Sequence, residues 1–132
     1  MSNQWKYKIE LASKNVFKEI EKKKGVTLPK EFKDLIIKAN AATPKNNHFM
    51  LGNNEKLLGA VLCFNKDEPD VDSVFTALDV VDNKNYIPFA IDPAGNYICL
   101  DIITNKVVFI EHETDTVEFT DQTLSEFVDS LY

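Results

Sequence analysis

The chain has 132 residues, which is the length of one ordinary domain and too short for two separate hydrophobic cores. With 44% hydrophobic and 27% charged residues, its composition is that of a folded globule rather than a disordered chain. The net charge is −6 and the sequence contains no arginine, the usual side chain for bidentate phosphate contacts, which argues against a reader of nucleic acid.

The first predicted element is a helix that ends at Gly25. Apolar residues recur at helical spacing over residues 9–20, and the lysines at 22–24 supply the cationic last turn that the helix dipole favours. We expect this helix to begin near Trp5. Its first apolar residues also alternate with period two, however, and Ser13 could cap a shorter helix.

A second helix is predicted in LPKEFKDLIIKAN, residues 28–40. Pro29 suits a first helical turn, where its missing N–H costs nothing, and Phe32 and Ile36 lie on one apolar face. Asn40 is placed to end the helix in a left-handed conformation.

After Pro44 the sequence changes to short apolar runs bounded by glycine and asparagine. HFMLG at 48–52 and LLGAVLCF at 57–64 are predicted to be the two strands of a hairpin, joined by GNNEK. The polar loop NKDEPDVDS follows. Asp72 in this loop can cap a third helix near residues 71–82.

Three consecutive strands and a last helix complete the predicted order. The strands are YIPFAI, NYICLDII and KVVFIEHE, within residues 86–113. Pro88 removes one ladder donor, so its strand lies at an edge or contains a bulge. The last helix lies within residues 120–132, with Asp121 or Thr123 as its cap.

The predicted order is therefore α-α-β-β-α-β-β-β-α, without regular βαβ alternation or an internal repeat. We predict an α+β fold, a single, mostly antiparallel sheet of about five to six strands flanked by helices, in one domain over residues 1–132. The predicted core residues of the sheet are Leu62, Phe64, Phe89, Ile91, Ile98, Leu100, Val108 and Ile110. Those of the helices are Phe17, Ile20, Leu35, Ile36, Phe127 and Leu131.

Three spaced signatures make the chain resemble the SUKH superfamily. They are GVTLPKEFKDLI followed by AN, IPFAIDPAGNYICLD, and VVFIEHET before the last helix, and the resemblance covers about residues 16–131. Where Asn-Gly-Gly is common in the superfamily, this chain has Asn40-Ala41-Ala42, and we expect Asn40 to supply the positive φ. The superfamily includes yeast cell-wall synthesis regulators and bacterial immunity proteins that neutralise secreted polymorphic toxins. The resemblance implies a SUKH-like fold that binds a protein and catalyses no reaction.

DPAGN at 92–96 could be an active site, a phosphate cradle or a turn. An active site would need the carboxylates of Asp92, Asp101 and Glu111 to lie about 5 to 10 Å apart in a cleft. A phosphate cradle is disfavoured because neither G-x-x-x-x-G-K nor G-x-G-x-x-G occurs. We favour a turn, in which Asp92 accepts hydrogen bonds from the loop backbone, and we assign no catalytic residue.

We also predict no metal site and no cofactor. His112 is flanked by acids, but neighbouring residues of a strand point to opposite faces and cannot converge on one ion. His48 has no partner at ligand spacing. The lysines at 22–24 could attract phosphate, although the helix dipole alone accounts for cations in a last turn.

Targeting signals and cysteines indicate a compartment. No apolar run approaches the roughly 18 residues of a membrane span, and the N-terminal sequence lacks the apolar centre of a signal peptide. Cys63 and Cys99 lie inside apolar runs without CxxC spacing, so we expect buried free thiols. We therefore expect a cytoplasmic protein without membrane contact.

Charge is divided unevenly along the chain. Residues 1–38 carry ten lysines and five acids, a balance of +5, whereas residues 39–132 carry five lysines and sixteen acids, a balance of −11. The acidic region favours a basic partner, and the resemblance implies that this partner is a toxin domain, such as a nuclease with a positively charged cleft. The predicted binding residues are Asp67, Glu68, Asp70, Asp72, Asp92, Glu111, Glu113 and Asp115.

Two other functions remain open. One is a regulatory or scaffold domain that binds an endogenous protein, as the resemblance to yeast cell-wall regulators implies. The other is an enzyme, which the lack of a recognisable nucleophile, metal or phosphate motif disfavours.

Overall fold

The computed structural model describes residues 3–132. Its helices are α1 (Asn15–Lys24), α2 (Lys30–Ala39), α3 (Val74–Val80) and α4 (Leu124–Ser130). A five-stranded antiparallel sheet has the order β5 (Ala60–Val61), β6 (Tyr86–Ile91), β7 (Tyr97–Asp101), β8 (Lys106–Glu111) and β9 (Thr116–Phe119). Two further antiparallel pairs are formed by β1 (Trp5–Lys6) with β2 (Thr43–Pro44), and by β3 (His48–Leu51) with β4 (Asn54–Leu57). The α+β class and the antiparallel sheet are therefore confirmed.

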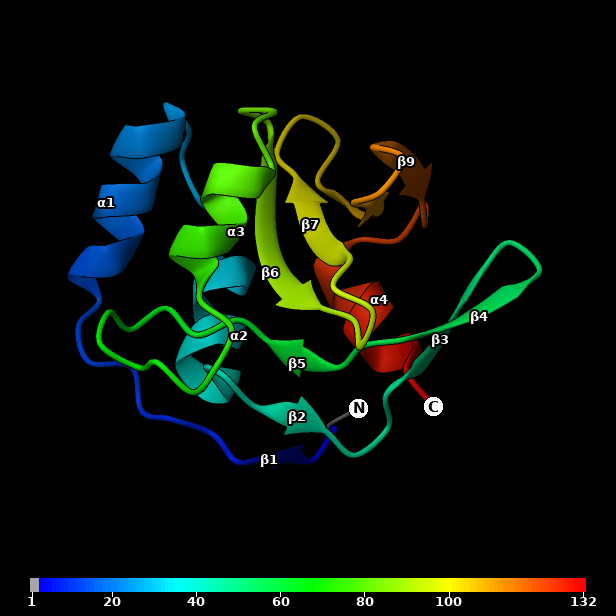
Figure 1. The fold of residues 1–132 in the computed structure, drawn as a ribbon, viewed down its shortest axis with the longest axis horizontal. Coiled ribbons are helices and arrows are strands. Elements are labelled where there is room, and N and C mark those ends of the chain that lie inside the picture. Colours follow the sequence, from blue (N-terminus) through cyan, green and yellow to red (C-terminus); the bar gives the residue numbers. More distant parts are fainter. Residues whose placement is uncertain (1–2) are drawn as a thin grey trace.

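One face of the five-stranded sheet, which we call the closed face, carries Ile98 and Phe109, paired in register. Figure 1 shows α2 and α4 behind this sheet. The ring of Phe127 in α4 lies 5.0 Å from that of Phe49 and 6.4 Å from that of Phe89, and the Phe49 ring lies 6.2 Å from that of Phe109. All four rings are buried. This interlocked aromatic layer is the centre of the core, because aromatic side chains bury more area than any others.

The opposite face, which we call the open face, carries a row formed by Tyr97, Ile110 and Val117, which are register partners on β7, β8 and β9. Helix α3 lies in front of the sheet in Figure 1 and covers only part of this face. Beyond the end of α3, Ile110 and Val117 are half-buried, and Phe119 on the edge strand is 59% exposed. Part of the sheet therefore has no helix over it.

The predicted core residues are buried, except that Ile91 and Ile110 are half-buried on the incompletely covered face. Cys63 and Cys99 are both buried and unpaired. The predicted bulge is confirmed, because the β6–β7 register shifts between Pro88 and Ala90. Thr123 is the cap of α4, where it forms a capping box with Glu126.

The predicted start of the first helix is wrong. The helix begins at Asn15 rather than near Trp5, which instead lies in strand β1. A helix cannot run through this segment because Tyr7 has a positive φ of 63°. The shorter alternative is therefore correct in length. Its cap position is Lys14 and not Ser13, although the Ser13 hydroxyl accepts a hydrogen bond from the Asn15 N–H at 3.1 Å.

The predicted left-handed conformation of Asn40 is also wrong. Asn40 has φ −53° and ψ 125°, and Ala41 takes the positive φ of 62° instead. Asn40 is buried, and its side chain donates to the Ile9 carbonyl at 2.9 Å and accepts from the Phe64 N–H at 2.7 Å. A buried amide needs hydrogen-bond partners, and these two bonds hold Asn40 at its negative φ. The left-handed conformation is therefore found at Ala41 instead.

The predicted hairpin has a different partner strand. Strand β3 pairs with Asn54–Leu57 across a turn at Gly52, which has a positive φ of 62°, whereas Ala60–Val61 joins the five-stranded sheet. The third helix is shorter than predicted and begins after Ser73, whose hydroxyl accepts from the Phe75 N–H at 3.0 Å, in place of the predicted Asp72 cap. Strand β9 was not predicted.

Candidate functional site

DPAGN is a turn, as predicted. The carboxylate of Asp92 accepts hydrogen bonds from the N–H groups of Ala94 at 3.0 Å and Asn96 at 2.7 Å, and from the Asn96 side-chain amide at 3.0 Å. Gly95 has a positive φ of 90°. Because these hydrogen bonds lie within the loop, the carboxylate of Asp92 serves the turn's own geometry.

The two aspartates that an active site would need lie at opposite ends of β7. Asp92 belongs to the turn before Tyr97, whereas Asp101 is the last residue of the strand. Five strand residues span roughly 13 Å from first to last Cα. Asp101 is buried and accepts from the Ile103 N–H at 2.9 Å, so its carboxylate caps the next turn and does not face Asp92 across a cleft.

The histidines have structural contacts. The His48 ring stacks on Tyr132 with ring centroids 5.7 Å apart, and the backbone N–H of His112 donates to the Asn96 side chain at 3.1 Å. Among residues 3–132, no three His, Cys, Asp or Glu side chains gather closely enough to hold a metal ion. In the same residues, no helix combines the length and apolar character needed to cross a membrane.

Acidic residues from two segments, distant in sequence, lie near the open face. Burial, and then the charge of Asp72, raise the pKa of Tyr97. Asp115 lines a groove together with Ile110 and Val117. Tyr97, Ile110 and Val117 form one row across the sheet, so Asp115 borders the incompletely covered part of the open face. Asp72 is exposed in the loop before α3 and does not line this groove.

The other predicted acids are more dispersed. Asp67 lines a separate hollow beside the first turn of α1, and Asp92 is engaged in its turn. Glu111 alternates with Ile110 along β8, so its side chain points toward the opposite side of the sheet. Glu113 lies exposed in the turn after β8. Glu68 and Asp70 lie in the loop that leads to Asp72, the former half-buried and the latter exposed.

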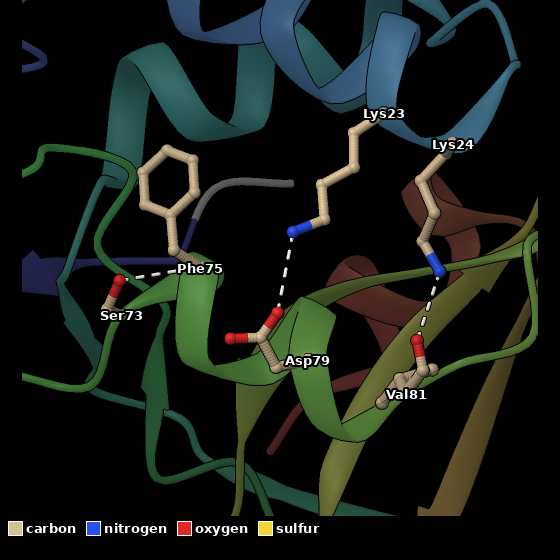
Figure 2. A network of polar contacts seen from close by, with 6 residues as sticks. All are labelled: Lys23, Lys24, Ser73, Phe75, Asp79 and Val81. Carbon is tan, nitrogen blue, oxygen red and sulfur yellow. Dashed lines mark hydrogen bonds and ion pairs between the residues drawn. The ribbon is translucent and has the colours of Figure 1, made fainter.

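Residues near the end of α3 were missed by the sequence analysis. Lys24 was interpreted only as a cation of a last helical turn, but it is buried, and its Nζ donates to the carbonyls of Val81 at 3.0 Å and Asn83 at 2.9 Å. Figure 2 shows Lys23 and Lys24 reaching from α1 to α3, where Lys23 pairs with Asp79 at 3.4 Å. Burial lowers the pKa of Lys24.

Lys23 thus contacts the C-terminal half of α3, and Lys24 binds the connection from α3 to β6. No periodicity in the sequence indicated this role, because the partners of Lys24 are backbone carbonyls. Asp82 lies in the same connection and lines the groove that also holds Asp115. Its signal in the sequence was weak, a lone acid between the end of a helix and the start of a strand.

Comparison with known proteins gives one family. The SUKH family model described as SMI1-KNR4 cell-wall matches residues 14–128, which is most of the chain. No curated protein matches the sequence.

Proposed function

Because the chain belongs to the SMI1-KNR4 cell-wall family of SUKH domains, we propose that it is an immunity protein that binds a basic toxin domain and blocks it. The match confirms the resemblance read from the three sequence signatures. Domains of this family are in general non-enzymatic and bind partner proteins. The proposal adds that the partner is a toxin, that it is basic, and that this domain inhibits it by occlusion in the cytoplasm.

The observation that carries the proposal is the groove on the incompletely covered sheet face, whose charged lining residues, Asp82 and Asp115, are both acids. A nuclease must keep a positively charged cleft to hold phosphates. An acidic surface around an apolar floor can occupy such a cleft, and opposite charges raise the association rate to about 10⁸ to 10⁹ M⁻¹s⁻¹ at low salt. Rapid binding suits a protein that must neutralise a toxin.

The test begins with the product of the neighbouring gene, because an immunity gene lies beside that of its toxin. Binding kinetics should be measured at two or more ionic strengths for the wild type and for the double variant Asp72→Lys/Asp115→Lys. We expect the variant to associate at least tenfold more slowly at low salt and to depend less on salt. The matched control is Asp34→Lys/Asp129→Lys, which makes the same charge change on α2 and α4.

Equal association rates for wild type and Asp72→Lys/Asp115→Lys at every salt concentration would count against the proposal. Recognition would then depend on apolar contacts, and the acidity would serve solubility.

A regulatory or scaffold role is the second candidate, favoured by the cell-wall description of the matching family. Such a domain would bind an endogenous protein, and its gene need not lie beside that of a toxin. Copurification of a chromosomally encoded, non-toxic protein, together with the absence of a toxin gene beside this one, would favour it.

A further inference from the structure

A groove of about 330 Å³ opens between the end of α3 and the edge of the sheet on the open face. Its lining residues come from α3, from the connection to β6, and from strands β6, β8 and β9 with the turn between the last two. They are Val80, Val81, Asp82, Asn83, Tyr86, Ile110, Asp115 and Val117. The groove thus has an aliphatic floor, one aromatic ring and two carboxylates.

The charged residues in this lining are both acids. Within residues 3–132, neither Asp82 nor Asp115 forms an ion pair, and both are exposed. Lys24 lies behind residues 81–83, where its Nζ donates to the carbonyls of Val81 and Asn83 and offsets part of the charge of Asp82. These hydrogen bonds also hold residues 81–83 in position.

Two other lysines lie nearby and do not line the groove. Lys84 is exposed and follows Asn83 in the chain. Lys106, on the open face, donates to the Asp121 carbonyl at 3.3 Å. The field inside the groove is therefore negative, although these cations reduce it.

The charge and shape of this groove fit a cationic side chain with a long apolar stem. We infer that the groove receives an arginine side chain of the partner protein, with its stem on Ile110 and Val117 and its guanidinium between Asp82 and Asp115. This inference rests on the proposed function, and it names the group that the acidic surface recognises. Arginine fits better than lysine because its planar, weakly hydrated guanidinium stacks on rings such as Tyr86 and can donate to two carboxylates at once.

A second groove, between α2 and α4, is a useful contrast. It has a volume of about 350 Å³ and is lined by acids, but Lys38 lines it as well. Glu31 accepts from the Ser125 hydroxyl at 2.9 Å, and Asp34 pairs with Lys30 at 2.9 Å. Because its acids are largely engaged and a cation is present, we expect this groove to bind arginine less well.

The test needs no partner. Nα-acetylarginine amide is titrated into ¹⁵N-labelled protein, and amide shifts are followed by NMR, with the neutral isostere Nα-acetylcitrulline amide and with Nα-acetyllysine amide as comparisons. We expect saturable shifts at the amides of residues 80–83, 110 and 115–117, with dissociation in the millimolar range or above for a single side chain. The citrulline compound should give no saturable shifts, and the lysine compound should bind at least threefold more weakly.

Two variants of equal charge change complete the design. Asp82→Asn/Asp115→Asn should weaken arginine binding at least fivefold, whereas Asp34→Asn/Asp129→Asn, in the second groove, should change it less than twofold. Dispersed amide spectra check that both variants are folded. These substitutions are isosteric and lie at exposed positions, so folding should be retained.

The inference is overturned by shifts that map to the groove between α2 and α4, by citrulline binding as well as arginine, or by an Asp82→Asn/Asp115→Asn variant that binds like the wild type. Any of these results would leave the proposed toxin binding standing. A toxin whose association rate is the same for the wild type and for Asp72→Lys/Asp115→Lys would remove the proposed electrostatic recognition, while a saturable arginine site would still stand.

Discussion

The two faces of the five-stranded sheet differ in how completely helices cover them. The closed face is sealed by α2 and α4 through interlocked rings, of which Phe109 and Phe127 are fully buried. Helix α3 covers only part of the open face, on which Phe119 is 59% exposed. The same strands supply both faces, so residues along β8 point alternately to the closed and to the open face, where Val108 is buried and Ile110 is half-buried.

The difference predicts that substitutions on the two faces have different effects on stability. Residues on the closed face contribute most of the burial free energy, so substitutions there should be costly. The exposed residues at the edge of the open face make few contacts, and their substitution should change recognition and leave stability almost unaltered.

Phe127→Ala should break the closed face. Removing this buried ring leaves a cavity against Phe49 and Phe89, which should lower the free energy of unfolding by about 3 to 5 kcal/mol. Urea denaturation measures the loss, and Phe127→Leu gives a smaller one if the alanine variant is too unstable. Phe119→Ala is the control on the open face, and we expect it to cost less than about 1 kcal/mol. Equal losses for the two alanine variants would remove the distinction between the faces.

Lys24→Met tests whether Lys24 stabilises the connection between α3 and β6, which borders the open face. The methionine keeps the apolar stem, but the carbonyls of Val81 and Asn83 lose their donor, so we expect a loss of about 1 to 3 kcal/mol in urea denaturation. Lys22→Met, two residues earlier in α1 and exposed, should cost less than about 0.5 kcal/mol. If the two methionine variants are equally stable, water replaces the ammonium group as donor, and Lys24 does not stabilise the connection between α3 and β6.

Thr123→Ala removes the hydroxyl of the capping box on the closed-face helix α4. We expect the free energy of unfolding to fall by about 1 kcal/mol at neutral pH. Hydrogen bonds from Thr123 lower the pKa of Glu126, so this carboxylate stabilises the fold above its ordinary pKa and loses that effect as the pH falls through its lowered value. Denaturation curves from neutral to acidic pH should therefore converge for wild type and Glu126→Gln at the acidic end. Parallel curves would exclude the linkage.

Ala41→Gly should stabilise the protein slightly. A left-handed conformation costs a residue with a Cβ about 1 to 2 kcal/mol, and glycine recovers this at the expense of chain entropy, for a net gain of about 0.5 to 1 kcal/mol. Thermal and urea denaturation measure the gain. Ala42→Gly, at a buried neighbour without positive φ, should lower stability by about 1 kcal/mol. A loss at both positions would mean that the buried methyl of Ala41 outweighs the strain.

The smallest effect on stability is expected for Asp72→Asn/Asp115→Asn. Both side chains are exposed, and asparagine tolerates the positive φ of 55° at residue 115, so the free energy of unfolding should change by less than about 0.5 kcal/mol while association with a basic partner slows. Urea denaturation and binding kinetics on the same samples make the comparison direct. A loss of several kcal/mol would show that the open face supports the fold.

Elements that are determined by residues close together in the sequence were predictable. The apolar face of α2 and the capping residue Thr123 are examples, since both depend on neighbours within a turn or two. The start of α1 was not predictable, because Tyr7 takes a positive φ in a segment held by strand pairing with residues about forty positions away. Local propensity gives no information on such a contact.

The binding residues remain a prediction, of which the structure gives the surroundings. The acids at 72 and 115 were chosen for charge and loop position, and Asp115 lines the groove on the open face. Asp82 and Lys24 were missed because their roles come from the packing of α1 against the end of α3, which no spacing within either segment encodes. Asp92 was also chosen, and its carboxylate is engaged within the turn.

The buried side chain of Asn40 has a consequence for hydrogen exchange. It joins the segment at Ile9 to the backbone of Phe64, positions 31 and 24 residues away from it along the chain. An amide group left buried without partners is costly, so these bonds should break together and not one at a time. The Phe64 amide proton should therefore exchange with solvent only when the whole domain opens, and the segment before α1 should belong to the same cooperative unit as the sheet.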